Sequence, residues 1–431
     1  MTSEKRRIGD RGHRVNRWNR IEPPLETLEN RKPGMSLKLQ SRQMVAGAAI
    51  AALAAVFSGG ASANPMIAVD VGSGRVIEHE QAFQRWYPAS LTKLMTIYVV
   101  FKAVKTGQMS LQTPVTMSVH AAKEPPSKMY FKPGERFPLD SALKYLMVKS
   151  ANDVAVAIGE AVSGTEEAFV RKMNATARQL GMNSTRFVNP HGLPGDGQYT
   201  TARDMALLAV ALRREFPEFA HYFAYEGFTT GKKNYTNYNL LIGRFAGADG
   251  MKTGFICASG FNQVSSATRN GKTVVSVVLG APSQETRAEA SAQLLQKALT
   301  TTAWGGARLQ SLAPYGDGRD RVTDISAEIC NAKARAARYE GRDVEGNMVL
   351  NSPYLAKMTR EPRLVQAPAG LPRANVEIAL SRVPIPVPRP GGILAGQVEP
   401  FAASAFTAPA NAAEMLPFSR GVPIPVPRPQ I

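Results

Sequence analysis

The chain has 431 residues, enough to bury a large hydrophobic core, and its length alone would suit two or three domains. It contains only two cysteines, Cys257 and Cys330, which excludes a metal site built on thiolates. Its formal net charge of +18 favours polyanionic surroundings.

An export signal is predicted near the N-terminus. Met44–Phe57 is a short, alanine-rich apolar run with Lys38 and Arg42 before it and small residues up to Ala63 after it. This order is typical of a secretory signal peptide, and the run is too short to span a bilayer comfortably. We therefore expect residues 1–63 to be an N-terminal extension and signal peptide, cleaved after Ala63. An uncleaved anchor is the alternative, and translation could start at Met1 or at Met35.

A β-hairpin and a helix are predicted next. The stretches Met66–Val71 and Arg75–His79 flank the tight turn Gly72–Gly74, which is the pattern of a hairpin. A helix is predicted from Ser90 to about Thr106, because apolar residues recur there at three- and four-residue spacing. The residues with this spacing are Leu91, Leu94, Met95 and Tyr98.

Ser90 and Lys93 stand at the start of this helix, where residues three apart project from the same side. A serine hydroxyl alone is a poor nucleophile at neutral pH. A lysine held beside it in a partly desolvated pocket loses its proton more easily and can act as the activating base. Taken alone, the spacing is a weak signal, because short patterns of common residues recur by chance.

Two further short motifs follow along the chain. Ser150–Asn152 ends a short helix for which Asp140 is the predicted cap. Lys252–Gly254 lies in the predicted strand Ala248–Cys257, which we expect at a sheet edge beside a pocket. Two more strands, joined by the turn Asn270–Gly271, are predicted after it. These strands are Phe261–Ala267 and Thr273–Leu279.

The longest diagnostic stretch lies between these motifs, in Thr185–Pro194 followed by Gln198–Asp204, where a helix is predicted from Ala202 to Arg214. In chain order, the four stretches resemble the penicillin-binding serine acyltransferases. The sequence closely resembles the serine-type D-alanyl-D-alanine carboxypeptidases, which are low-molecular-mass penicillin-binding proteins of the peptidase S11 family. The resemblance covers most of residues 64–300.

The resemblance implies an α/β (α+β) fold of the penicillin-binding protein and β-lactamase type. In this transpeptidase fold an antiparallel sheet is flanked by helices and joined to a helical subdomain, here within residues 64–311. Residues 312–351 are expected to be a helical extension, in which Thr323–Arg338 could make one helix. Many relatives carry a second, all-β domain and an amphipathic C-terminal anchor, and the sequence shows the pattern of neither.

A proline-rich, disordered tail is predicted over residues 352–431. The segment Val383–Pro390 is repeated with an identical sequence at Val422–Pro429. Alternating prolines of this kind favour a stiff polyproline helix. The tail could be a spacer or a docking element.

The resemblance also implies roles for the first two motifs. Ser90 would be the nucleophile that forms the acyl ester, and Lys93 the general base. Ser150 would relay a proton between Lys93 and the leaving amine. Asn152 would orient Lys93 and hydrogen-bond the substrate backbone.

The third motif would bind the substrate. Lys252 and Thr253 would hold the free carboxylate of a peptide's last residue, since ammonium and hydroxyl groups both donate to it. Gly254 would let the substrate approach the strand closely. The backbone amides of Ser90 and Phe255 would form the oxyanion hole.

The implied activity is removal of the terminal D-alanine from peptidoglycan stem peptides, with no metal and no organic cofactor. β-Lactams are expected to inhibit it by acylating the same serine. A DD-endopeptidase is an alternative, because it shares the chemistry. A β-lactamase would need a carboxylate to activate the deacylating water, and the loop Asn183–Tyr199 offers no glutamate. A non-catalytic wall-binding protein conflicts with the intact motifs.

Residues near the motifs have less specific interpretations. Phe255–Ser259 replaces a more polar run of the family, which we expect to affect substrate preference. Cys257 and Cys330 could form a disulfide in an oxidising compartment, or remain two buried thiols. His191 is expected to be a structural residue satisfied by its own loop. Arg287 is expected to be a solvated or salt-bridged surface residue, and the alternative is a residue that supports the site from behind the substrate-binding side chains.

The predicted location is the periplasm, so no nucleic-acid partner is expected for this basic chain. Its positive charge could contact anionic wall polymers or membrane headgroups, or form a basic surface with no specific partner. The sequence leaves the oligomeric state open.

Overall fold

The structure is a computed structural model, and it describes residues 64–302, 305–340 and 348–371. The predicted signal peptide with its cleavage after Ala63, and the repeats that begin at Val383 and Val422, lie outside the described residues. Within the described ranges, no helix combines the length and apolar character needed to cross a membrane.

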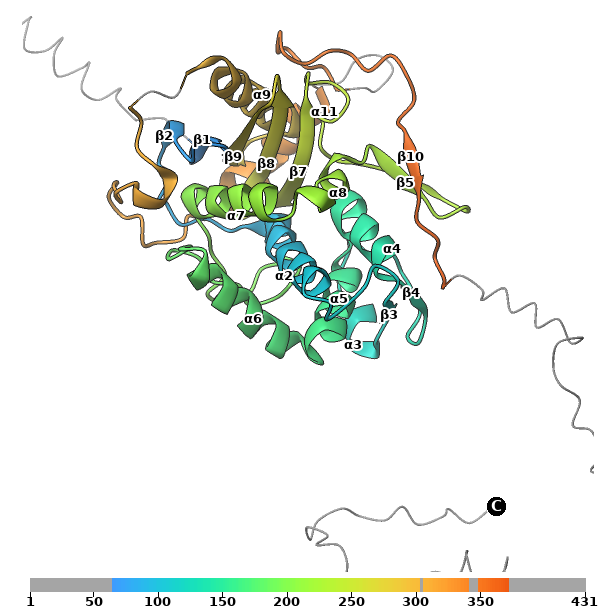
Figure 1. Ribbon diagram of the computed structural model, residues 1–431. Helices are drawn as coiled ribbons and strands as arrows, with labels where there is room; N and C mark the ends of the chain where they lie inside the picture. The colour runs from blue at the N-terminus through green and yellow to red at the C-terminus, as the bar shows by residue number, and fades with distance from the viewer. Residues whose placement is uncertain (1–63, 303–304, 341–347, 372–431) are drawn as a thin grey trace, which may run out of the picture. The chain divides into compact units, whose positions relative to one another are not determined.

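A five-stranded antiparallel sheet has the strand order β2-β1-β9-β8-β7 (Figure 1). Both predicted hairpins are confirmed, since β1 pairs with β2 and the turn Asn270–Gly271 joins β8 to β9. β7 is last in the order and is therefore an edge strand, as expected. The strands are β1 (Met66–Asp70), β2 (Val76–Glu80), β7 (Ala248–Ile256), β8 (Gly260–Arg269) and β9 (Lys272–Ala281).

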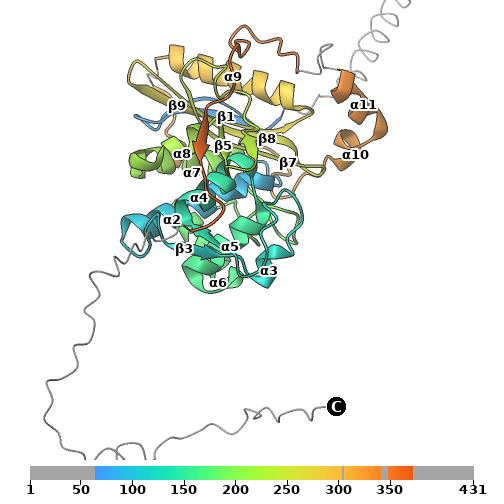
Figure 2. The same ribbon diagram turned by 90° about the vertical axis from the view of Figure 1, so that its right-hand side faces the viewer.

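Helices cover both faces of this sheet, and the alternation of side chains along β9 shows how. Val275 and Val277 pack into the cluster that contains the α7 side chains, whereas Val274 and Val278 pack into the cluster that contains those of α9. Figure 2 shows α9 above the sheet and α7 below it. The two helices are α7 (Ala202–Glu215) and α9 (Gln284–Thr300).

Both helices begin at a hydroxyl side chain that caps the first turn. Thr201 Oγ1 accepts a hydrogen bond from the backbone N–H of Asp204, and Ser283 Oγ accepts one from Thr286. The helix predicted from Ala202 is therefore confirmed.

A helical subdomain lies beside the sheet, and α2 runs through its centre (Figure 1). The predicted apolar residues of α2 are buried, and so are all the residues from Lys93 to Phe101, which is typical of a central helix. This part of the chain contains helices, short strands and a 3-10 turn. They are α2 (Lys93–Lys105), β3 (Pro114–Thr116), α3 (Val119–Ala122), β4 (Arg136–Pro138), α4 (Leu139–Lys144), α5 (Asn152–Ser163), α6 (Glu166–Gln179), the 3-10 turn Pro217–Phe219 and α8 (His221–Ala224).

Asp140 does not cap α4, contrary to the sequence-based expectation. The helix begins at Leu139 after Pro138, and Asp140 lies inside its first turn. Its carboxylate instead accepts hydrogen bonds from Lys144 Nζ and Tyr222 Oη, both at 2.6 Å. The carboxylate therefore links α4 to α8.

The C-terminal part of the described chain corrects two expectations. Thr323–Arg338 forms two short helices, not one, and they are α10 (Ser326–Ile329) and α11 (Ala332–Glu340). Residues 352–371 belong to the same compact unit as the sheet, so the disordered tail does not begin at Ser352. Within them, β10 (Leu364–Gln366) joins a small sheet with β5 (Gly227–Thr229) and β6 (Asn234–Thr236). Short-range patterns could not reveal this pairing, because β10 and β5 lie far apart in the sequence.

Candidate active site

Ser90 lies in the 3-10 turn Ala89–Thr92, which leads directly into α2, so the α-helix itself begins at Lys93. The turn brings the two side chains together, with Lys93 Nζ 3.1 Å from Ser90 Oγ. Lys93 is fully buried, whereas Ser90 is half-buried. A hydroxyl within hydrogen-bonding distance of a buried amine is the arrangement that base-assisted acylation requires.

Lys93 also faces two carbonyl oxygens. Its Nζ lies 2.8 Å from Asn152 Oδ1 and 2.7 Å from the backbone oxygen of His191. A neutral amine has two N–H donors and one lone pair. When both donors engage these oxygens, the lone pair is left for the Ser90 hydroxyl. The backbone of His191 was missed at the sequence level, because a carbonyl group carries no signal of its own.

The environment of Lys93 favours the neutral amine. Burial lowers its pKa well below the ordinary value of 10.5, and the charge of Lys252 lowers it further. The carboxylates of Asp153 and Glu124 raise the same pKa, but by less than burial lowers it. Lys93 is therefore neutral, and able to act as a base, at a lower pH than an exposed lysine.

The motif Ser150–Asn152 lies on the other side of Lys93, at the start of α5. Asn152 Nδ2 donates to the backbone oxygen of Pro125 at 2.9 Å, which leaves Oδ1 facing Lys93. Ser150 has a left-handed backbone, with φ 61° and ψ 38°. Its Oγ is buried and has no hydrogen-bond partner among the described residues. Strained backbones and unpaired polar groups are typical of functional sites.

Lys252 and Thr253 are buried on β7, where Lys252 Nζ donates to the backbone oxygen of Thr253 at 2.9 Å. Burial lowers the pKa of Lys252 to about 7, and the charge of Arg287 contributes. A Cβ at Gly254 would lie only 3.0 Å from the backbone nitrogen of Ser90. Glycine therefore allows β7 to approach the turn that carries the nucleophile.

Arg287 is buried, so the expectation of a solvated surface residue was wrong. Its side chain is 3% exposed, and its guanidinium lies over the ring of Phe261 at 5.8 Å. Its Nη2 donates to the backbone oxygen of Tyr238 at 3.3 Å, whereas its Nε has no partner in the described chain. Burial lowers the pKa of Arg287 to about 10. The polar neighbours in the sequence concealed this burial, which follows from the packing of α9 on β8.

The His191 side chain has the structural surroundings that the sequence suggested. The backbone N–H of Leu193 donates to His191 Nδ1 at 3.1 Å, so Nε2 carries the proton when the ring is neutral. That nitrogen lies 3.1 Å from Glu124 Oε2, and this hydrogen bond lowers the pKa of Glu124. The pair fixes the loop whose backbone oxygen contacts Lys93.

One group of side chains in the described ranges has the spacing of a metal site. The ligand atoms of His120, Glu124 and Glu166 lie within 4.8 Å of one another. His120 Nε2 is 2.6 Å from Glu166 Oε2, and this hydrogen bond raises the pKa of His120. An ion pair therefore accounts for this arrangement.

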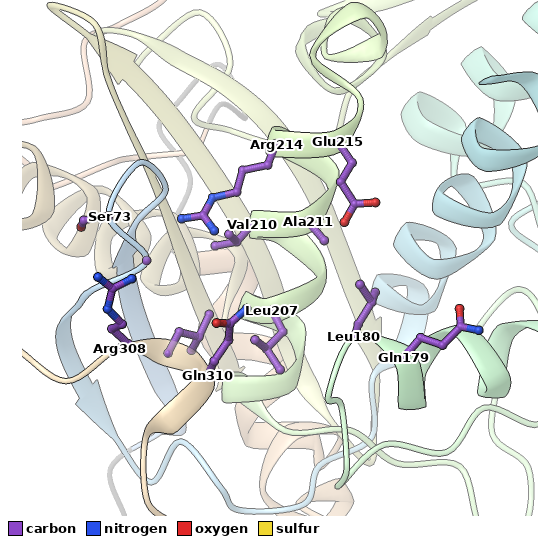
Figure 3. A pocket seen from close by; sticks show the side chains of 12 residues that line it. Ser73, Gln179, Leu180, Leu207, Val210, Ala211, Arg214, Glu215, Arg308 and Gln310 are labelled. Atoms are coloured by element: carbon purple, nitrogen blue, oxygen red, sulfur yellow. The ribbon is translucent and has the colours of Figure 1, made fainter. Parts of the chain in front are cut away.

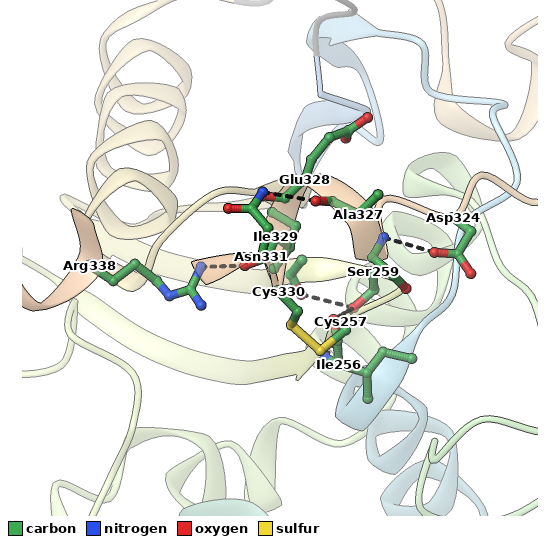
Figure 4. The surroundings of a disulfide bond; sticks show 12 residues. Ile256, Cys257, Ser259, Asp324, Ala327, Glu328, Ile329, Cys330, Asn331 and Arg338 are labelled. Carbon is green, nitrogen blue, oxygen red and sulfur yellow. Dashed lines mark hydrogen bonds between the residues drawn. A yellow bond between two sulfur atoms is a disulfide. The ribbon is translucent and has the colours of Figure 1, made fainter. Parts of the chain in front are cut away.

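The two cysteines are joined. Cys257, in the turn that follows β7, forms a disulfide with Cys330, which follows α10, and their Cα atoms are 5.6 Å apart (Figure 4). The bond connects residues 73 positions apart in the sequence.

A pocket of about 320 Å³ lies between α7 and the turn that joins β1 to β2 (Figure 3). Arg214, Glu215 and Arg308 supply its charged groups. None of the motif residues lines it, so this pocket is separate from the candidate active site.

Residues 51–283 match the family model described as D-alanyl-D-alanine carboxypeptidase. The chain belongs to this family, peptidase S11. The expected fold class and the expected class of serine hydrolase are thereby confirmed, and the protein is a penicillin-binding protein of peptidoglycan metabolism.

Individual relatives support the same assignment. The chain is 36% identical to D-alanyl-D-alanine carboxypeptidase DacC of Escherichia coli strain K12, over 65% of this chain and 70% of that protein. Penicillin-binding protein 5 from Haemophilus influenzae is 36% identical, with a TM-score of 0.52 over 55% of this chain and 70% of that one. Penicillin-binding protein D2 from Listeria monocytogenes, solved in a cefotaxime-bound form, is 31% identical, with a TM-score of 0.51 over 55% and 97%.

Proposed function

We propose that the protein removes the terminal D-alanine from peptidoglycan stem peptides through an acyl-enzyme on Ser90. The observation that carries this proposal is the environment of Lys93, a buried amine with two carbonyl acceptors and one serine hydroxyl around it. The signal-peptide pattern supports a periplasmic location.

In the acylation step, Ser90 Oγ attacks the carbonyl carbon of the penultimate D-alanine, and its proton passes to Lys93 Nζ. The backbone amides of Ser90 and Phe255 stabilise the negative charge that develops on the carbonyl oxygen. When the C–N bond breaks, the proton moves from Lys93 through the hydroxyl of Ser150 to the nitrogen of the departing D-alanine. The unpaired Ser150 Oγ is free to make both hydrogen bonds.

The free carboxylate of the substrate is held by Lys252 and Thr253, with Arg287 as an additional cation. Burial makes Lys252 and Arg287 costly to keep charged, so an anion that pairs with them is bound favourably. This carboxylate requirement favours peptide bonds whose leaving residue carries a free carboxylate. Water then attacks the acyl ester, and Ser90 regains its proton.

β-Lactams are the proposed inhibitors, because their strained amide and their carboxylate resemble those of the substrate. The cefotaxime-bound form of the Listeria monocytogenes relative supports this expectation. A DD-endopeptidase activity is the second candidate, because it shares this chemistry and differs only in the shape of the pocket that holds the leaving group.

The test is intact-mass spectrometry of the mature protein, incubated with a pentapeptide that ends in D-Ala-D-Ala and separately with penicillin. We expect the peptide to lose one alanine and the protein to gain one penicillin. Ser90→Ala is the control and should show neither change. A penicillin adduct without release of alanine would overturn the carboxypeptidase proposal in favour of an endopeptidase.

The pH dependence of kcat/KM should reflect the protonation of Lys93 and Lys252. Below the lowered pKa of Lys93 the base is protonated, so acylation slows as the pH falls. Above a pH of about 7, Lys252 loses its charge in the free enzyme, so binding of the carboxylate weakens as the pH rises. A pH profile of peptide hydrolysis should therefore be bell-shaped.

Two measurements test whether Lys252 causes the fall in kcat/KM on the alkaline side of this profile. In Lys252→Arg the alkaline limb should move to higher pH, because a guanidinium stays protonated. A peptide with an amidated C-terminus should be a poor substrate at every pH and should show no alkaline limb near 7. An alkaline limb that is unchanged in both measurements would contradict the role of Lys252.

A further inference from the structure

The position of the bound peptide along β7 follows from the proposed function. The terminal carboxylate lies at Lys252 and Thr253, and the scissile carbonyl lies at the amide of Phe255. The residues that precede D-Ala-D-Ala must therefore extend beyond Phe255, toward Cys257. The peptide would run antiparallel to the free edge of β7, as an added strand.

A segment from the C-terminal extension lies at that end of β7. We call residues 324–338 the stapled segment, because its Cys330 is bonded to Cys257 (Figure 4). The backbone N–H of Ile325 donates to Ala258 O at 3.1 Å, which gives a second connection to the same turn. The turn is also held from the other side, where Trp86 Nε1 donates to the backbone oxygen of Ser259 at 2.8 Å.

The stapled segment also supports the exposed aromatic side chain at the edge of the site. Phe255 is 42% exposed, and its ring centroid lies 4.2 Å from that of Phe261. The guanidinium of Arg338 lies 5.7 Å from the centroid of Phe261, while Arg338 Nη1 donates to the backbone oxygen of Ile329 at 2.7 Å. Arg338 thus connects α11 to α10 and to the ring of Phe261.

The stapled segment lies outside the residues matched by the family model, which end at residue 283, whereas Phe255 and Cys257 lie within them. We propose that the stapled segment and Phe255 form a subsite for the stem-peptide residues that precede D-Ala-D-Ala. The subsite consists of the stapled segment and the side chain of Phe255, and these make no contact with the reacting atoms. It therefore raises the affinity for a stem peptide and leaves acylation of Ser90 unchanged.

The test compares two substrates in the full mature chain, a stem pentapeptide and N-acetyl-D-Ala-D-Ala, which is too short to reach the subsite. In the double variant Cys257→Ser and Cys330→Ser, the stapled segment is no longer bonded to the turn after β7 and its contacts with the stem peptide are lost. KM for the pentapeptide should therefore rise by about tenfold. Hydrolysis of the short substrate and labelling by fluorescent penicillin should stay within about twofold of wild type.

Arg338→Ala provides a second variant that keeps the disulfide, and it decides the test if the double variant does not fold. It should likewise raise KM for the pentapeptide and leave hydrolysis of the short substrate unchanged. Arg335→Ala is the matched control, because Arg335 is exposed on the same helix, and it should shift nothing. An equal loss on both substrates, or no loss on either, would overturn the proposal. The proposed function would fail differently, with no release of D-alanine from either substrate by the wild-type protein.

Discussion

Replacing Lys93 by methionine is expected to slow the acylation of Ser90 by penicillin by about 10³-fold, which is within the usual range for loss of a general base. Lys93 Nζ is the amine beside Ser90 Oγ at 3.1 Å. Methionine fills a similar volume and has no basic group. The rate of labelling by a fluorescent penicillin, measured at several penicillin concentrations, gives the acylation rate constant directly.

The loss should not come from unfolding. Methionine leaves two buried acceptors without their donor, Asn152 Oδ1 and the backbone oxygen of His191, which costs about 2 kcal/mol in the free energy of unfolding. Asn152 keeps its other hydrogen bond to Pro125. Thermal denaturation should therefore show a modest decrease in Tm. Lys102→Met is the matched control, because Lys102 is exposed on the same helix, and it should change neither rate nor Tm.

Lys93→Arg separates the role of a base from that of a positive charge. A guanidinium stays protonated at neutral pH and cannot take the proton from Ser90. The arginine variant should therefore be as slow as the methionine variant. Acylation within about tenfold of wild type in either variant would mean that another group activates the serine.

The sequence predicted the elements whose local pattern matches their final environment. The apolar spacing after Ser90 predicted a helix correctly because those apolar residues are buried in α2. Asn270–Gly271 predicted a hairpin because both residues adopt a positive φ there. In these places the local preference and the tertiary packing agree.

The sequence could not predict features that arise from contacts between distant segments. The backbone oxygen of His191 reaches Lys93 only because two loops meet, and no residue type encodes that. Arg287 looks exposed in a polar stretch but is buried by the packing of α9. The pairing of β10 with β5, and the choice between a disulfide and two free thiols, likewise depend on distances in three dimensions.

The loop that carries His191 also contains the glycine at which we expect the largest effect on stability. Gly192 has a φ of +90°, and a Cβ there would lie 1.8 Å from the backbone oxygen of Ala89. Gly192→Ala therefore combines a left-handed backbone with a clash against main chain, and main-chain atoms cannot rotate away as a side chain can. We expect it to lower the free energy of unfolding by about 4 kcal/mol, measured by urea denaturation.

Gly197→Ala is the matched control in the same loop. Gly197 has a similar φ of +79°, but the nearest atom to its added Cβ would be Arg186 Nη1 at 3.2 Å, the far end of a flexible side chain. It should cost only the backbone strain, about 1–2 kcal/mol. The two variants therefore share the strain and differ in the clash. Equal destabilisation by both would contradict the close contact between Gly192 and Ala89.

The same clash should also reduce acylation in the molecules that remain folded. Ala89 immediately precedes Ser90, and the Cβ at Gly192 would lie 2.8 Å from Thr92 Oγ1 as well, so relief of the clash must shift the turn that carries the nucleophile. A displacement of about 1 Å at a reacting group can cost about 10²-fold in rate. Penicillin labelling of the folded fraction should show such a loss for Gly192→Ala and near wild-type rates for Gly197→Ala. Loss of stability with an unchanged rate would mean that the loop yields and the Ser90 turn stays in place.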